Sequence, residues 1–361
     1  MHFAYAGDYS SPTLSRFAQQ LRETLQDLGH HYHDRVTEDV TLVVNFTDAK
    51  RPRAFRRRSQ AVFVVSVVEV DEEPEDVLKT AYPLLIRTLS NLLLYLVNHD
   101  DGWTTHFVTL EQGTYSIPER PADGRAYYSA VSSRLLPLAT STLVINNRFV
   151  PDLPPELWEG NETTREITWA GKKLDAMGLL PAPFPIEELL PERDFRHVRR
   201  LYGIGGLSYG NLSARHDARS FWMSASGVDK SNLRTIGRDI LLVTGYDPEE
   251  NAMILSVPPH VEPRRVSVDA IEHWMIYTEH PEVGAIVHIH GWIPGVPSTV
   301  INYPCGTYQL AKAVAEIVRQ AEDPAQAVVG LRNHGLTITG RSLRDIFERI
   351  EGKVVRQVPM T

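Results

Sequence analysis

The strongest constraint on the fold is a pair of short, nearly continuous apolar runs in the first part of the chain. These runs are "VTLVVNF" (40–46) and "AVFVVSVVEV" (61–70). Such runs are typical of strands buried on both faces of a sheet, and such a sheet needs helices to cover it. Apolar residues at helical spacing between Pro12 and Gly29 predict a covering helix, with Ser11 as its cap. We therefore expect an α/β layer domain here.

Other elements of this domain are predicted from composition. The segment "EPEDVLKTAYPLLIRTLSNLLLYLVN" (73–98) predicts one or two helices, broken near Pro83. Residues 105–117 predict a pair of strands, and "TLVINNRFV" (142–150) predicts another strand. The region has no glycine-rich phosphate loop, so its pattern assigns it no function.

A proline-rich stretch, "VPDLPPELWEG" (150–160), marks a boundary between two domains. We expect an α/β N-terminal domain of unknown role over residues 1–155. A second domain is expected over residues 162–361, beginning with a helix near 162–178.

Composition excludes several classes of protein. The chain has 361 residues, a net charge of -8 and a pI near 6.0, which argues against nucleic-acid and anionic-membrane binding. The single cysteine, Cys305, excludes an internal disulfide and favours a cytoplasmic location. The longest apolar stretch (82–97) is too short and too often interrupted to predict a membrane span. One basic run (49–60) is expected to be a solvated loop, with a patch that binds an anionic ligand or a partner as the alternative.

The segment "VHIHG" (287–291) places two histidines one residue apart, directly after an apolar run. In a β-strand, His288 and His290 would project from the same face. Two imidazoles on one face suit a metal ion, because each offers a neutral nitrogen ligand. The alternatives are a surface pair or buried histidines satisfied by hydrogen bonds.

Further polar patches flank this pair. Glycines and short polar residues in two of them permit tight turns that could bind an anion through backbone N–H groups. Asp269 precedes a predicted helix, where capping alone would explain it. Another helix is expected after Gly306 and Thr307. In order, the patches are "GLSYGNLSAR" (206–215), "SFWMSASGVDKSNL" (220–233), Asp269, "GTYQLAKAV" (306–314) and "RNHGL" (332–336).

Taken in this order, the patches resemble the class II aldolase/adducin family over roughly residues 162–361. The resemblance implies an α/β/α domain with a central, mainly antiparallel sheet. It also implies a divalent metal ion held by His288, His290 and His334, with Zn²⁺ expected and Mn²⁺ or another ion as the alternative. Family members are homo-oligomers, so a tetramer is expected.

The resemblance further implies a metal-dependent lyase of carbohydrate metabolism. Such an enzyme cleaves or forms a C–C bond in a small, hydroxylated, sugar-like carbonyl substrate through a metal-stabilised enediolate. The family's acid/base residue falls at Asp269. Three roles stay open for Asp269: helix cap, metal-site carboxylate, or general acid/base.

The family's substrate-binding positions fall at Asn211, Ser226, Gly227 and Ser267. One hydroxyl of the usual pair is missing here, because Val268 follows Ser267, which weakens a phosphate site. Arg215 or Lys230 could compensate, although Lys230 taken alone is predicted to lie on the surface.

Two kinds of alternative remain. An epimerase, a decarboxylase or a dehydratase would use the same scaffold and the same enediolate chemistry. A non-catalytic, adducin-like interaction module would keep the fold without the metal. Glu272 and His273 follow Asp269 and are expected to be helix-surface or packing residues.

Overall fold

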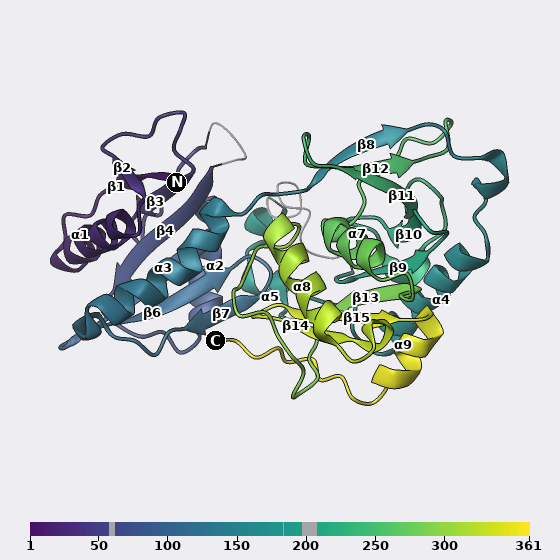
Figure 1. Cartoon of the computed structure of the whole chain (residues 1–361). Helices are drawn as coiled ribbons and strands as arrows, with labels where there is room; N and C mark the ends of the chain where they lie inside the picture. Colours follow the sequence, from purple (N-terminus) through teal and green to yellow (C-terminus); the bar gives the residue numbers. More distant parts are fainter. Residues whose placement is uncertain (58–61, 183, 197–207) are drawn as a thin grey trace. The chain divides into compact units, whose positions relative to one another are not determined.

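The computed structural model describes residues 1–57, 62–182, 184–196 and 208–361 (Figure 1). Parts of two predicted segments, residues 58–60 of the basic run and 206–207 of the first polar patch, lie outside these ranges. The described residues form two compact units. The first comprises those of Met1–Thr140, Phe184–Gly205 and Met360–Thr361, and the second those of Ser141–Pro183 and Gly206–Pro359.

The first unit is an α/β layer, as predicted. Among its described residues, seven strands form a sheet in the order β2-β1-β3-β4-β5-β6-β7. The first five strands in that order run parallel, and the last two pairings are antiparallel. Its elements are β1 (His2–Gly7), α1 (Pro12–Asp27), β2 (His31–His33), β3 (Leu42–Phe46), β4 (Phe63–Val70), α2 (Val77–Arg87), β5 (Leu92–His99), β6 (Gly102–Thr109), β7 (Gly113–Ser116), η1 (Pro121–Asp123), α3 (Arg125–Thr140) and α5 (Ile186–Leu189).

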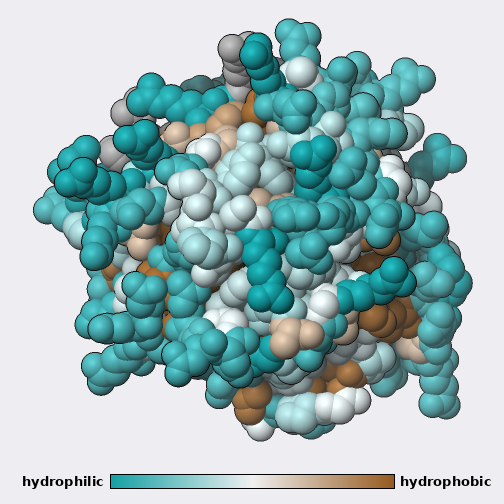
Figure 2. Space-filling view, turned by 90° about the vertical axis from the view of Figure 1, so that its left-hand side faces the viewer, coloured by the Kyte–Doolittle hydropathy of each residue, from teal (hydrophilic) through white to brown (hydrophobic). Residues whose placement is uncertain are grey.

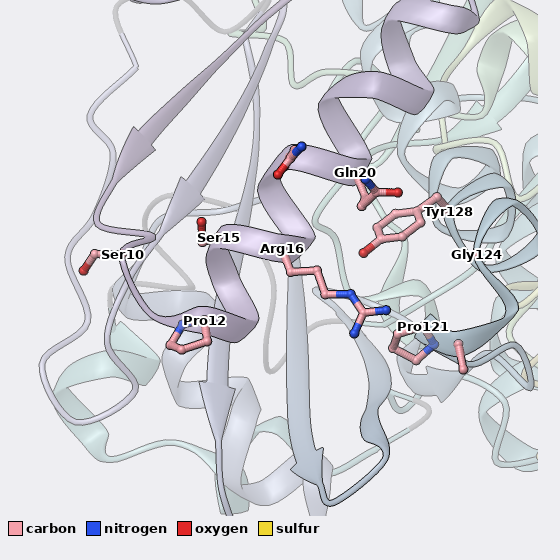
Figure 3. A pocket seen from close by; sticks show the side chains of 10 residues that line it. Ser10, Pro12, Ser15, Arg16, Gln20, Pro121, Gly124 and Tyr128 are labelled. Carbon is pink, nitrogen blue, oxygen red and sulfur yellow. The ribbon is translucent and has the colours of Figure 1, made fainter.

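Local chemistry explains the start of this unit. Ser11 accepts a hydrogen bond from the N–H of Leu14, and Pro12 occupies the first turn of α1. Gly29 follows the helix with φ +83°, which ends it as predicted. Helix α1 packs beside α3 (Figure 1). Arg16, Gln20 and Tyr128 help to line an open cavity of about 610 Å³ beside these helices (Figure 3).

The prediction of helix over residues 73–98 is wrong for its second half. Helix α2 continues through Pro83 and ends at Arg87, and Leu89 then adopts φ 55°. Leu92–His99 form β5, which pairs with β4 and β6. A short apolar run fits a buried strand as well as a buried helix. These residues form a strand because β4 and β6 provide hydrogen-bonding partners on both sides.

The second unit contains the other sheet, with the order β14-β15-β13-β9-β10-β11-β12-β8. All its pairings are antiparallel except that of β12 with β8. Its elements are β8 (Asn146–Val150), η2 (Pro155–Leu157), α4 (Glu162–Ala176), β9 (Asn211–Arg215), β10 (Phe221–Ser224), η3 (Lys230–Asn232), β11 (Ile240–Asp247), β12 (Ala252–Ser256), α7 (Ala270–Glu279), β13 (Ala285–Ile289), α8 (Tyr308–Gln320), η4 (Pro324–Gln326), β14 (Val328–Leu331), β15 (Gly335–Gly340) and α9 (Leu343–Ile350).

One strand that was predicted for the N-terminal domain belongs to the second unit. The sequence placed residues 142–150 with the N-terminal domain, but β8 pairs in parallel with β12 of the second sheet. The pairing partner lies about 100 residues further along the chain, and local pattern carries no information on it.

Helices cover both faces of the second sheet. Leu212 and Ser213 are neighbours on β9, so their side chains point to opposite faces. Leu212 approaches Gly171 of α4, whereas the Ser213 hydroxyl bonds His273 of α7. Helix α9 packs with α4, and α8 packs with α7. The unit is therefore an α/β/α sandwich around a mainly antiparallel sheet, as expected.

The face in Figure 2 is mainly hydrophilic, with small, separate hydrophobic areas. Among the described residues, no helix has both the length and the apolar character needed to cross a membrane.

Candidate metal centre

Strand β13 presents the H-x-H pair on the face covered by α7. His288 lies in register with Asn211 of β9 on one side and with Thr337 of β15 on the other. His290 follows directly after the strand. Both side chains are buried, with exposed fractions of 1% and 8%. The alternative of a surface pair is therefore wrong.

The third histidine comes from the turn between β14 and β15. Asn333 adopts φ 57°, a conformation that asparagine tolerates better than most residues. A Cβ on Gly335 would lie 2.1 Å from the carbonyl oxygen of Ile289, so the turn can press against β13 only with glycine there. This contact carries His334 to the end of the strand that bears the other two histidines.

The three imidazoles converge. Each offers a ring nitrogen within 4.8 Å of the others. The ring centroids lie 4.7–5.2 Å apart. Nε2 of His290 and Nε2 of His334 are 3.1 Å apart. Two nitrogens bound to one tetrahedral zinc ion at 2.0–2.1 Å would lie about 3.3 Å apart, so the observed spacing suits a shared ion.

The protonation states also fit a metal ion. Burial lowers the pKa of His288 to about 4 and that of His334 to about 3, and it lowers the pKa of His290 well below its ordinary value. The imidazoles are therefore neutral near pH 7 and keep a lone pair for a metal. Nδ1 of His288 donates to the carbonyl of Leu336, while its Nε2 is buried without a hydrogen-bond partner. A metal ion would satisfy this nitrogen.

Asp269 lies beside this group. Asp269 precedes α7, but its side chain makes no capping hydrogen bond. The role of helix cap that the sequence left open for Asp269 is therefore not supported. Its Oδ2 accepts from the amide of Asn211 at 2.8 Å, and its carboxylate also accepts from the N–H of Gly306. Burial raises the pKa of Asp269, whereas its electrostatic interactions with His334 and Lys230 and these hydrogen bonds lower it. The metal cluster itself contains no carboxylate.

The remaining predicted residues lie on three adjoining segments. Asn211 is buried and directs its amide to Asp269, with Oδ1 lacking a partner. Ser226 and Gly227 form an exposed turn, in which Gly227 adopts φ +68°. The N–H of Ser226 donates to the carbonyl of Arg265, and that of Ser267 donates to the carbonyl of Ser224. The turn therefore runs along the segment that leads to Asp269.

The prediction that Lys230 lies on the surface is wrong. Its side chain is buried, and its Nζ donates to the carbonyl of Ser208 at 2.6 Å. Burial lowers the pKa of Lys230 to about 8, against the raising effect of Asp269. Helix α4 approaches so closely that a Cβ on Gly171 would lie 1.9 Å from the Lys230 carbonyl oxygen. This packing encloses a residue type that sequence patterns place in solvent.

Helix α7 has no exposed face at its start, so Glu272 and His273 are not helix-surface residues. Both are buried, with exposed fractions of 2% and 0%. Burial raises the pKa of Glu272 to about 8, and the charge of Asp269 adds to the effect. The hydroxyl of Thr337 donates to Glu272, and Nδ1 of His273 bonds the hydroxyl of Ser213. These residues form a polar layer between α7 and the strands of the site.

Cys305 lies beside the third histidine. It is half-buried, and its Sγ lies 3.4 Å from each ring nitrogen of His334. The two residues are 29 positions apart in the chain, so no local pattern could indicate the contact.

Comparison with protein families agrees with this arrangement. Residues 195–292 match the class II aldolase and adducin N-terminal domain. Over these residues the chain is similar to a class II aldolase domain. The match includes Asn211, Asp269, His288 and His290, whereas His334 lies beyond it and joins the site only through the fold.

The relatives of this domain include enzymes. Methylthioribulose-1-phosphate dehydratase of Citrobacter koseri is 24% identical over 40% of this chain and 78% of its own length. The same enzyme of Cronobacter sakazakii is 24% identical over 40% of this chain and 82% of its own length. The predicted family and its enzymatic character are confirmed, and the particular reaction stays a prediction.

Two solved structures show weaker similarity. YgbL of Klebsiella pneumoniae, described as an aldolase/epimerase/decarboxylase, has a TM-score of 0.35 at 19% identity, over 53% of this chain and 84% of its own. YgbL of Escherichia coli has a TM-score of 0.35 at 18% identity, over 52% and 82%. The family assignment rests on the domain match.

Proposed function

We propose that the class II aldolase domain is a metal-dependent lyase that acts on a small, hydroxylated, sugar-like carbonyl compound. The observation that carries the proposal is the convergence of three buried, neutral imidazoles beside a buried carboxyl group. The expected ion is Zn²⁺, with Mn²⁺ as the alternative. Imidazole-rich sites favour zinc among the common divalent ions.

His288, His290 and His334 would hold the ion, and three protein ligands leave a position open for substrate. When bound, the ion would supply a Lewis acid for the carbonyl and hydroxyl oxygens of the substrate, which favours an enediolate. The unpartnered Nε2 of His288 supports this role, since a buried nitrogen without a partner is costly.

Asp269 is the proposed acid/base residue. Asn211 and the N–H of Gly306 hold its carboxyl in place, which prevents the rotations that an exposed aspartate would make. Burial raises its pKa, which makes the carboxylate a stronger base for removing and returning a substrate proton. The alternative role as a metal-site carboxylate finds less support, because Asp269 is not part of the histidine cluster.

Asn211, Ser226, Gly227 and Ser267 are the proposed substrate-binding residues. The turn at Ser226 and Gly227 is exposed and lies along the segment that leads to Asp269, so it can reach a ligand from solvent. Its hydroxyl and backbone groups suit the polar or anionic end of a substrate. Lys230 adds a positive charge near Asp269, which supports an anionic substrate.

Two reactions compete within the proposal. Cleavage or formation of a C–C bond is the first candidate. Elimination of water is the second, and the dehydratase relatives favour it. Dehydration and C–C bond formation both begin with removal of a proton from the carbon beside the carbonyl group, whereas C–C cleavage begins with removal of a hydroxyl proton. Epimerases and decarboxylases could use the same stabilisation of an enediolate. Retention of the three histidines argues against an adducin-like interaction module. Family resemblance also supports a homo-oligomer, with a tetramer proposed.

The test uses ketose phosphates, including methylthioribulose 1-phosphate, in deuterated water with zinc-loaded protein. Proton NMR would follow deuterium exchange next to the carbonyl group and the products formed. We expect exchange that Asp269→Asn abolishes. Two smaller carbonyl products would indicate C–C cleavage, and a dicarbonyl product with all carbons retained would indicate dehydration. Absence of both exchange and product with every compound would contradict the proposed function.

A further inference from the structure

A second H-x-H pair lies in the first unit, outside the site described above. It consists of His31 and His33 on strand β2. This strand is at the edge of its sheet and pairs in parallel with β1. In that pairing His2 lies opposite His31, and Ala4 lies opposite His33. Because side chains alternate along a strand, His2, His31 and His33 project from the same face.

Tyr32 fixes this orientation. Its ring packs against Phe3 and Tyr5, at centroid distances of 5.4 and 5.2 Å. The guanidinium of Arg22 lies 3.9 Å from the centre of the Tyr32 ring. These contacts hold Tyr32 on the face that α1 covers, so the two flanking histidines must point the other way.

The three imidazoles lie close together on that face. Nδ1 of His2 is 2.7 Å from Nε2 of His33. The ring centroid of His2 lies 5.1 Å from that of His31 and 5.0 Å from that of His33. Within the described part of the chain, the rings of His2 and His33 have no other hydrogen-bond partner, and His31 has none. His31 is exposed, so its ring can turn toward the other two.

We propose that His2, His31 and His33 bind a second transition-metal ion, of the class that prefers imidazole ligands: Zn²⁺, Ni²⁺ or Cu²⁺. His2 and His33 already place two nitrogens side by side, and they need to separate only slightly to share an ion. A bound ion would link β2 to β1 and so hold the edge strand in register. The proposal uses no residue of the proposed lyase site and stands independently of it.

The edge site is expected to be weaker than the buried one. Its three nitrogens are not all within 4.8 Å of one another, unlike those of the buried histidines. Binding must therefore order at least one exposed side chain, which lowers the affinity. The absence of a carboxylate from the trio disfavours Ca²⁺ and Mg²⁺.

The test is a calorimetric titration of the metal-stripped, full-length protein with Zn²⁺. The variants are His33→Ala and, as a matched control, His99→Ala, which removes an exposed histidine of the same unit. We expect a weak binding event in the unmodified chain and in His99→Ala that His33→Ala loses. Any tight event should persist in all three proteins.

Two results would overturn the proposal: no weak event in the unmodified chain, or a weak event unchanged in His33→Ala. A missing tight event would count against the lyase site alone, because the comparison with His33→Ala concerns only the weak event. Cu²⁺ electron paramagnetic resonance of the chain loaded at the weak event gives a second readout. Coupling to histidine nitrogens is expected, and its reduction in His33→Ala would confirm the ligands.

Discussion

Strands β13 and β2 both carry histidines at positions i and i+2, yet they place them in different surroundings. His288 and His290 are buried in the interior of a sheet, and His334 reaches them from a neighbouring turn. His31 and His33 lie on an edge strand, and His31 is exposed. Spacing along the strand sets only the direction of the side chains. Burial and the neighbouring strands decide whether the nitrogens are fixed and whether other groups can act on a ligand.

The comparison teaches what preorganisation requires. In the buried centre, the Leu336 carbonyl fixes the tautomer of His288, and Asn211 fixes Asp269. The described residues show no carbonyl acceptor for the rings of the edge histidines. Both groups of histidines are expected to bind a metal ion. Only the buried group lies beside a carboxyl group, Asp269, that can transfer a proton to or from a substrate.

The largest effect is expected from Asp269→Asn. The amide keeps the shape of the side chain but cannot accept a proton, so turnover should fall on the order of 100- to 10,000-fold. Metal content should be unchanged, because the cluster of ligands lacks Asp269. Steady-state kinetics and metal analysis would check both points, with the exposed Asp217→Asn as control. Unchanged turnover would remove Asp269 as the acid/base residue.

A pair of glycine substitutions compares the two strands directly. Gly210 precedes β9 with φ +72°, and a Cβ there would lie 2.4 Å from the His288 carbonyl oxygen. Gly29 precedes β2 with φ +83°, and no atom lies within 4 Å of its Cβ position. Gly210→Ala should cost about 3 kcal/mol or more, and Gly29→Ala about 1 kcal/mol, by urea unfolding.

Metal affinity separates the two glycine variants further. Gly210→Ala should weaken zinc binding at the buried centre, because it displaces the backbone of His288, and Gly29→Ala should leave that binding unchanged. Equal costs for both substitutions would show that the close approach at Gly210 does not constrain the centre.

Lys230→Met tests the buried charge in the second unit. The pKa of Lys230 is lowered from 10.5 to about 8, so the folded state disfavours the charged form. Below about pH 8 the lysine is charged in both states and its burial destabilises the fold. As pH rises from about 8 to about 10.5 the unfolded state holds more protons, so wild-type stability rises.

The metal-free Lys230→Met variant should therefore be more stable than wild type at pH 7, by about 1–3 kcal/mol. This advantage should shrink between about pH 8 and 10.5. Thermal unfolding at several pH values would measure it. A difference that does not depend on pH would contradict the buried, lowered-pKa state of Lys230.

The smallest effect is expected from His31→Ala at the edge strand. His31 is the most exposed of the three ligands and must turn to bind, so its loss should weaken the second zinc event by about tenfold. His33→Ala should remove the event. Calorimetric titration of both variants would rank them, and a larger loss in His31→Ala would reverse the proposed order of ligands.

Sequence patterns anticipated much of this molecule where a local rule sufficed. The helix at Pro12–Asp27 follows from its Ser11 cap and its periodicity, and the strand with His288 and the helix after Asp269 follow from their apolar patterns. The joining of His334 to the pair came from family resemblance, since spacing alone does not bring residues 44 positions apart together.

The wrong predictions concern features that depend on contacts between residues far apart in the sequence. Leu92–His99 form a strand because β4 and β6 pair with it, although the run has the length and apolarity of a helix. Lys230 is buried beside helix α4, and Glu272 is buried between its own helix α7 and Thr337 of β15, against the ordinary preference of charged residues. Sequence spacing does not bring His2 to His31 and His33, because these residues meet only through the parallel pairing of β1 with β2.

The central claim is that β13 carries the tight metal centre. It is tested most directly by metal analysis of dialysed wild-type, His288→Ala and His33→Ala proteins, refilled with zinc and checked for folding by circular dichroism. We predict about one ion per chain in the wild type and in His33→Ala, and none in His288→Ala. Failure of the refilled wild type to retain an ion, or full retention by a folded His288→Ala, would contradict the account.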